Sequence, residues 1–158
     1  MKKVCFLLIF VLLLSGCQAV DTFETVRDVY QVQSAPGNIS LAVPATAQTV
    51  ANDNGILYLC DGYEITVETM SSGNLTQTVQ MLTGFAPDAL TVMQTAVSGV
   101  NRYECVWSAA GESGDMVGRA VILDDGQYHY CVTVMSQAET AGELSSVWQE
   151  LLSSVELN

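Results

Sequence analysis

The sequence of 158 residues is acidic, with 17 Asp and Glu against 5 Lys and Arg. Two of the five cations are Lys2 and Lys3, so the chain after Cys17 has three arginines, no lysine and a net charge of −14. Nucleic acid and anionic lipid headgroups repel such a surface. We therefore exclude nucleic acid as a partner, and we exclude charge as the force that would hold this chain at a membrane.

The N-terminus has the parts of an export signal. Lys2 and Lys3 precede an unbroken apolar run from Val4 to Leu14, which is shorter than the about 20 residues that span a bilayer as a helix. The run ends in Leu14-Ser15-Gly16-Cys17. We predict that residues 1–16 are a signal peptide. The alternative is an ordinary secretory signal in which the cysteine stands by chance.

Leu14-Ser15-Gly16-Cys17 resembles the lipobox of bacterial lipoproteins. The resemblance implies that a diacylglycerol is attached to the Cys17 thiol, that the leader is cut just before it, and that acyl chains such as palmitate hold the mature protein on the extracytoplasmic face of the cell membrane. Two acyl chains suffice for stable anchoring, whereas one gives only marginal binding. The pattern leaves inner and outer membranes equally open.

After Cys17 about 140 residues remain, the size of one domain. Residues 17–38 are interpreted as a lipidated tether of ambiguous structure, because Phe23, Val26, Val29 and Tyr30 fit a helical face while Val26, Tyr30 and Val32 fit a strand. We expect residues 39–158 to form a single domain.

That domain begins with clear strand signals. Residues 39–43 alternate in polarity and Pro44 ends the run. Residues 56–60 and 63–70 flank Asp61-Gly62, which predicts a tight hairpin with positive φ at both central residues and Tyr58 opposite Ile65. Asn74 and Gly84 are predicted to cap a helix between them.

The remainder is read as a strand-rich half closed by a helix. Strands are expected over residues 90–97, 102–110, 117–124 and 127–135. Asp125-Gly126 repeats the hairpin signal, and counting back from it places Ala120 opposite Cys131. The looser turn at residues 111–114 places Cys105 opposite Ala120. Cys105 and Cys131 would then lie two strands apart, too far for a disulfide.

The last helix is expected over residues 138–155, with an apolar stripe at spacings of three and four. The final strands are apolar on both faces, so both faces need cover. We predict an α+β fold in which an antiparallel sheet is covered by helices on both faces, an α/β/α sandwich with a C-terminal amphipathic helix.

This order of elements, with Ile39-Ser40-Leu41-Ala42-Val43-Pro44 near its start and Tyr128-His129-Tyr130-Cys131-Val132-Thr133-Val134 near its end, resembles the PsbP-like fold over residues 39–157. Members of that superfamily are mostly accessory binding proteins without known catalysis. The resemblance carries over no binding residue, because the sequence holds no diagnostic motif.

No residue set specifies a reaction, a metal site or a cofactor. His129 is the only histidine, and we interpret it as structural rather than as a general base. Cys60, Cys105 and Cys131 fit no zinc spacing, and pairing of Cys60 with either of the others stays open. Asn52-Asp53-Asn54-Gly55 has the residue types of a weak cation site, but a polar turn is the simpler interpretation.

Three classes of function follow. The sequence favours a membrane-anchored, non-catalytic binding or accessory module of the cell envelope, with an unidentified envelope protein as its partner. The alternatives are an envelope hydrolase that uses His129 or a carboxylate pair from distant segments, and a purely structural envelope lipoprotein.

Overall fold

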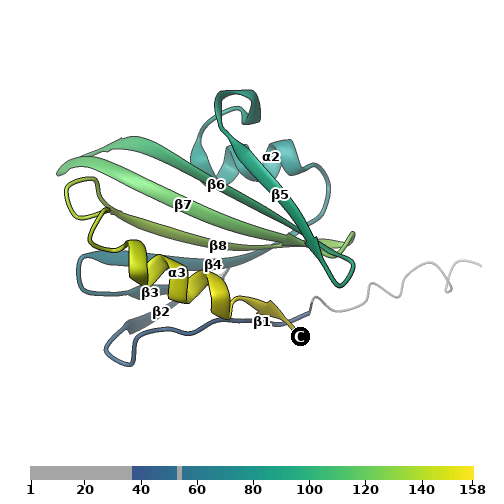
Figure 1. Ribbon diagram of the computed structural model, residues 1–158, viewed down its shortest axis with the longest axis horizontal. Coiled ribbons are helices and arrows are strands. Elements are labelled where there is room, and N and C mark those ends of the chain that lie inside the picture. Colours follow the sequence, from purple (N-terminus) through teal and green to yellow (C-terminus); the bar gives the residue numbers. More distant parts are fainter. Residues whose placement is uncertain (1–36, 53–54) are drawn as a thin grey trace, which may run out of the picture. The chain divides into compact units, whose positions relative to one another are not determined.

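The computed structural model describes residues 37–52 and 55–158, which belong to one compact unit, Pro36–Asn158. Seven antiparallel strands form one sheet in the order β2-β3-β4-β8-β7-β6-β5 (Figure 1). Their bounds are β2 Gln48–Asn52, β3 Gly55–Leu59, β4 Tyr63–Ser71, β5 Val92–Val97, β6 Val100–Gly111, β7 Gly114–Asp124 and β8 Tyr128–Gln137. The α+β class predicted from the sequence is confirmed.

A second, two-stranded sheet joins the two ends of the described domain. β1 (Ile39–Ser40) pairs antiparallel with β9 (Glu156–Leu157). Asn38 and Asn158 exchange two backbone hydrogen bonds beside this pair, at 3.2 and 2.9 Å. The predicted first strand over residues 39–43 is therefore too long, because only its first two residues find a partner strand.

The hairpin at Asp61-Gly62 forms as predicted. Tyr58 lies opposite Ile65, and the Cys60 amide donates to the Tyr63 carbonyl at 2.9 Å. Gly62 has φ +81°, but Asp61 does not share the positive φ that we expected at both central residues. Both central residues have positive φ instead at Ser98 and Gly99, the tight turn that joins β5 to β6.

The hairpin at Asp125-Gly126 is present, but its predicted register is wrong by two residues. Asp124 pairs with His129, which places Thr133 rather than Cys131 opposite Ala120. The carboxylates set this register: Asp124 accepts from the Gly126 amide at 2.8 Å, and Asp125 accepts from the amides of residues 127 and 128 at 2.8 and 2.7 Å. These bonds centre the loop on residues 126 and 127.

Helix α2 (Leu75–Thr83) has the predicted caps. The Asn74 side chain accepts from the Thr76 amide at 2.9 Å, and Gly84 adopts φ +76° while its amide donates to the Gln80 carbonyl. A single 3-10 turn, η2 (Pro87–Ala89), leads into β5. The observed strand therefore begins at Val92, two residues later than predicted.

Helix α3 (Ser145–Ser154) is shorter than the helix predicted over residues 138–155. β8 extends to Gln137, and turns occupy the interval up to Leu144. Thr140 closes the first of these turns, because its amide and its hydroxyl both donate to the Gln137 carbonyl at 3.2 Å. After α3 the chain returns to an extended form at Glu156 to build β9.

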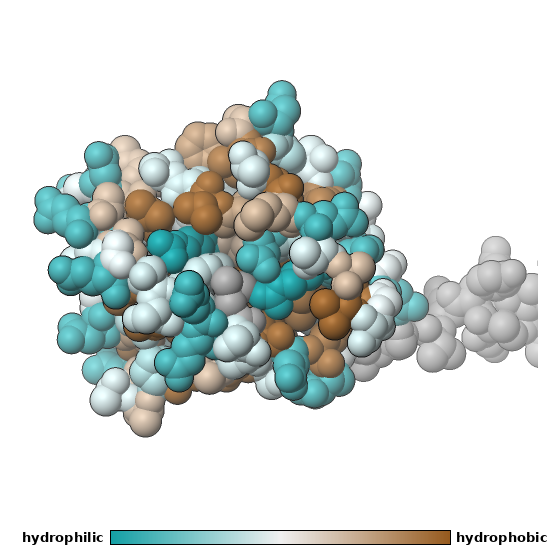
Figure 2. Space-filling view, viewed as in Figure 1, coloured by the Kyte–Doolittle hydropathy of each residue, from teal (hydrophilic) through white to brown (hydrophobic). Residues whose placement is uncertain are grey.

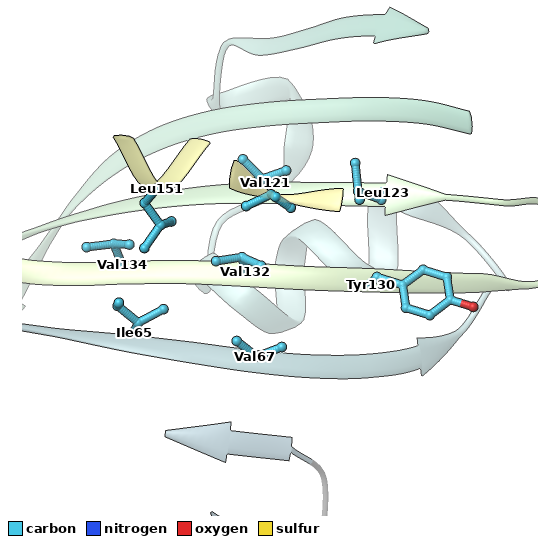
Figure 3. Packing of buried hydrophobic residues seen from close by; sticks show 9 residues of the cluster. Ile65, Val67, Val121, Leu123, Tyr130, Val132, Val134 and Leu151 are labelled. Atoms are coloured by element: carbon cyan, nitrogen blue, oxygen red, sulfur yellow. The ribbon is translucent and has the colours of Figure 1, made fainter. Parts of the chain in front are cut away.

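The core lies on both faces of the central strands. On one face, Leu151 of α3 and Val155, which follows the helix, belong to a buried cluster that also contains residues of β4, β7 and β8 (Figure 3), namely Ile65, Val67, Val121, Leu123, Tyr130, Val132 and Val134. On the other face, Val79 of α2 packs against Ile122 and Cys131. Alternation along β7 and β8 separates the two clusters.

Candidate functional site

A groove of about 570 Å³ lies between the turn of β5 and β6 and the end of α3. One wall comes from the sheet and the other from residues 153–157. The lining residues are Val97, Ser98, Val100, Arg102, Leu123, Ser153, Val155, Glu156 and Leu157. The lining is mostly aliphatic and contains neither histidine nor cysteine, so it suits binding of an apolar group better than proton transfer.

The groove continues into an uncovered part of the sheet. Met93 and Val97 of β5 and Val106 of β6 point to the same face as α3, because they share the alternation of Glu104 and Val121. These residues are 58%, 66% and 55% exposed. The buried cluster under α3 takes its residues from β4, β7 and β8, so the helix leaves this outer hairpin open. We call Met93, Val97 and Val106 the outer apolar face.

One ion pair crosses this region. The Arg102 guanidinium donates from Nε to Glu104 Oε1 at 2.7 Å, and both side chains are only partly exposed, 17% and 25%. Arg102 lines the groove, so a cation stands beside aliphatic walls on a chain whose net charge after Cys17 is −14. The hydrogen bond fixes the direction of the arginine side chain.

A second hollow of about 250 Å³ lies between residues 42–44 and α3. Tyr63, Val147, Glu150 and Leu151 complete its lining. Desolvation, with the neighbouring Cys60 and Glu150, raises the pKa of Tyr63 to about 12. The phenol is therefore protonated at neutral pH and can donate a hydrogen bond, but it is no base there.

His129 forms a cluster that has the order of a catalytic triad. Its Nδ1 lies 2.7 Å from the Thr78 hydroxyl, and its Nε2 lies 3.8 Å from Asp124 Oδ2. A triad requires a nucleophile that a substrate can reach. Thr78 is 2% exposed and His129 is 3% exposed. The cluster lies between α2 and the sheet, where it joins the helix to β8 through a buried hydrogen bond.

The three described thiols are also unsuited to chemistry. Burial raises the pKa of Cys105, and burial together with Glu68 raises the pKa of Cys131 to about 12. Both lie in clusters on the α2 side of the sheet, whereas Cys60 packs against the cluster on the α3 side. All three are free cysteines. The sheet separates Cys60 from the other two, and this argues against either pairing left open by the sequence.

The acidic residues form no metal cluster within residues 37–52 and 55–158. Asp53 of the Asn52–Gly55 segment lies outside the described residues, as does Cys17. Neither helix in the described part of the chain combines the length and the hydropathy of a membrane span. The lipidation prediction at Cys17 therefore stays a prediction.

No protein-family model and no curated protein sequence matches this chain. Its fold does match solved structures. The cyanobacterial PsbP (CyanoP) of Synechocystis sp. PCC 6803 aligns with a TM-score of 0.57 and 8% identity, covering 80% of this chain and 96% of that chain. LpqN, involved in cell envelope biogenesis of Mycobacterium tuberculosis, aligns with a TM-score of 0.51 and 12% identity, covering 80% and 87%.

A protein from Bacteroides thetaiotaomicron aligns with a TM-score of 0.53 and 8% identity over 76% of this chain. The chain spans 45% of that protein, less than half of its length. Together the likenesses to PsbP and LpqN place this chain among α+β proteins with a PsbP-like fold, the class predicted from its element order. At these identities the likeness concerns the fold alone.

The sequence did not single out the groove or the outer apolar face. One signal was available: residues 92–97 contain no charged residue and no proline. Such a run predicts an ordinary strand, and a strand of that composition is normally buried. Its position at the edge of the sheet could not be read from its composition.

Proposed function

We propose that this chain is a lipid-anchored, extracytoplasmic module that binds a protein partner of the cell envelope without catalysis. In this proposal the PsbP-like domain is a three-layer α/β/α unit, and lipid on Cys17 holds it at the cell membrane. The observation that carries the binding role is the aliphatic groove beside the outer apolar face. Exposed apolar residues beside a hollow are typical of interaction sites.

The likeness to LpqN supports an envelope role, and the likeness to PsbP supports an accessory role. A lipid anchor would also raise the effective concentration of the domain toward partners in the same membrane. The acidic chain favours a partner surface that is neutral or basic.

The anchor is tested by fractionating cells that express the wild-type chain or Cys17→Ser. We expect the wild type in the membrane fraction at the size of the processed chain, and the variant released or unprocessed. A Cys17→Ser chain that is processed and stays in the membrane would contradict lipidation.

An envelope hydrolase is the second candidate, because Asp124, His129 and Thr78 lie in a triad-like order. The burial of Thr78 and His129 argues against it. Profiling the purified chain against esters, peptides and glycosides decides between the two. We expect no turnover; activity that disappears in Thr78→Val or His129→Ala would replace the binding proposal with the enzyme.

A further inference from the structure

We propose that the partner adds an extended segment to the free edge of β5, and that this segment alternates apolar residues with basic or neutral ones. The inference rests on the proposed binding function and specifies how the partner is held. β5 is the last strand of the seven-stranded sheet, hydrogen-bonded on one side to β6 and on the other side to no strand of the described residues. An edge of this kind offers unpaired amides and carbonyls to an incoming strand.

The edge lacks the features by which natural proteins block strand addition. Such edges usually carry lysine, proline or a bulge. Residues 92–97 read Val-Met-Gln-Thr-Ala-Val, without charge or proline, and they pair with β6 residue for residue. Five of these six residues are exposed, those from Met93 to Val97. The strand is therefore regular, neutral and accessible along its length.

The register tells which backbone groups face outward. The turn at Ser98 and Gly99 is a two-residue loop, so the flanking Val97 and Val100 exchange both backbone hydrogen bonds. Bonded pairs alternate along an antiparallel ladder. Met93 and Thr95 are thus bonded to β6, and the amides of Val92, Gln94 and Ala96 point away from it. Gln94 and Ala96 are exposed residues, so an added strand would bond to them.

Side chains beside the edge explain the preference for alternating apolar residues. Met93, Val97 and Val106 present apolar surface on the α3 side, and the groove is lined by Val97. Figure 2 shows hydrophobic (brown) areas among hydrophilic ones on one face of the molecule. Every second side chain of an added strand would extend this surface, since side chains alternate between faces. The net charge of −14 after Cys17 favours basic residues at the alternate positions and disfavours a second copy of this chain.

β2 is the other edge of the sheet, and it fits less well. The exposed large apolar residues of β2 and β3 are Val50, Ile56 and Leu59, at 46%, 37% and 40%. Register places Val50 and Leu59 on one face and Ile56 on the other, so they form no single surface. The β5 edge therefore carries the inference, and β2 serves as an internal control.

The test uses the full chain in neutral detergent and a labelled peptide of eight residues that alternates valine and lysine. Two control peptides contain valine alternating with glutamate, and four valines followed by four lysines. We expect the alternating basic peptide to bind best, and its affinity to fall with salt. Hydrogen exchange resolved by residue should show new protection at Gln94 and Ala96, because these outward amides of exposed residues gain partners.

A matched pair of variants isolates the backbone contribution. Gln94→Pro removes an outward amide, and proline is tolerated on an edge strand when its nitrogen faces solvent. Gln94→Ala removes the side chain and keeps the amide. We expect Gln94→Pro to bind the peptide about tenfold more weakly, which equals the loss of about one hydrogen bond. Gln94→Ala should bind like wild type, and thermal unfolding confirms that both variants fold.

Three results would overturn the inference: equal binding by Gln94→Pro and Gln94→Ala, new protection in β2 or α2 instead of β5, or no preference among the three peptides. Self-association of the wild type that Gln94→Pro abolishes would assign the edge to a second copy and overturn the choice of partner. Capture of an envelope protein by Gln94→Pro but not by Val97→Lys would contradict strand addition. The proposed binding function would still hold.

Discussion

β8 and β5 are both apolar strands of one sheet, yet they have opposite surroundings. Seven of the ten residues of β8 are buried, whereas five of the six residues of β5 are exposed. β8 lies between β4 and β7, with Leu151 of α3 packed on one side and Val79 of α2 on the other, and β5 lies at the edge of the sheet. The comparison separates two uses of the same residue types, because apolar side chains in β8 hold the fold together while those in β5 remain available to another molecule.

The largest expected effect is a truncation in β8. Tyr130 is fully buried, and its hydroxyl donates to Asp125 at 3.0 Å and accepts from the Gly37 amide at 2.7 Å. Tyr130→Ala should reduce the free energy of unfolding in urea by about 3–5 kcal/mol. Val97→Ala on β5 should change it by less than about 0.5 kcal/mol. Similar losses for the two variants would show that β5 is covered in solution.

The next effect distinguishes two buried threonines on the α2 side. Thr78→Val leaves His129 Nδ1 without its hydrogen bond of 2.7 Å, so we expect a loss of about 1–3 kcal/mol. The Thr133 hydroxyl is buried and has no hydrogen-bond partner among the described residues. Thr133→Val should therefore be neutral or stabilising in the same urea titration. A loss at Thr133 equal to that at Thr78 would mean that the Thr133 hydroxyl is satisfied.

Alkaline pH should destabilise the domain through β8. Burial, with Glu68, raises the pKa of Cys131 from 9.0 to about 12 in the folded state, so above pH 9 the unfolded chain loses this proton while the folded chain keeps it. The free energy of unfolding should fall between pH 9 and 12 by about 1.4 kcal/mol per pH unit for this thiol. Cys131→Ala should make the slope shallower, whereas Cys60→Ala, at a half-buried site, should alter it less.

The smallest effect concerns the turn beside β8. Gly126 has φ +89°, and a Cβ there would meet no atom within 4 Å, so Gly126→Ala adds backbone strain without a clash. We expect a cost of about 1 kcal/mol. Gly73→Ala is the matched control, because that site is equally open and has no positive φ. It should be neutral or slightly stabilising; equal costs at the two glycines would contradict the strain argument.

Local chemistry explains which parts of the fold could be predicted. The caps Asn74 and Gly84 and the turn at Asp61-Gly62 act over a few residues, and their predictions are confirmed. The predicted register of β7 and β8 is wrong because Asp124 and Asp125 accept hydrogen bonds from amides of the turn. These bonds move the centre of the turn. β9 is a strand because β1 lies beside it, which no local pattern records. The groove likewise arises from segments far apart in the sequence.

The pairing of β1 with β9 has a consequence for how the domain is assembled. The Asn158 side chain donates to the Ser40 hydroxyl across 118 positions of sequence, so the first described strand has no partner until the last residues are in place. Contacts of such separation form late and slowly, because a long loop must close before they contribute. Because the two ends of the described domain lie side by side, a circular permutant can be made. In it, Asn158 is linked to Gly37 and new ends are opened at the Gly111–Gly114 turn. In that molecule β1 and β9 would become neighbours in sequence, and the slowest contact of the native chain would become a local one.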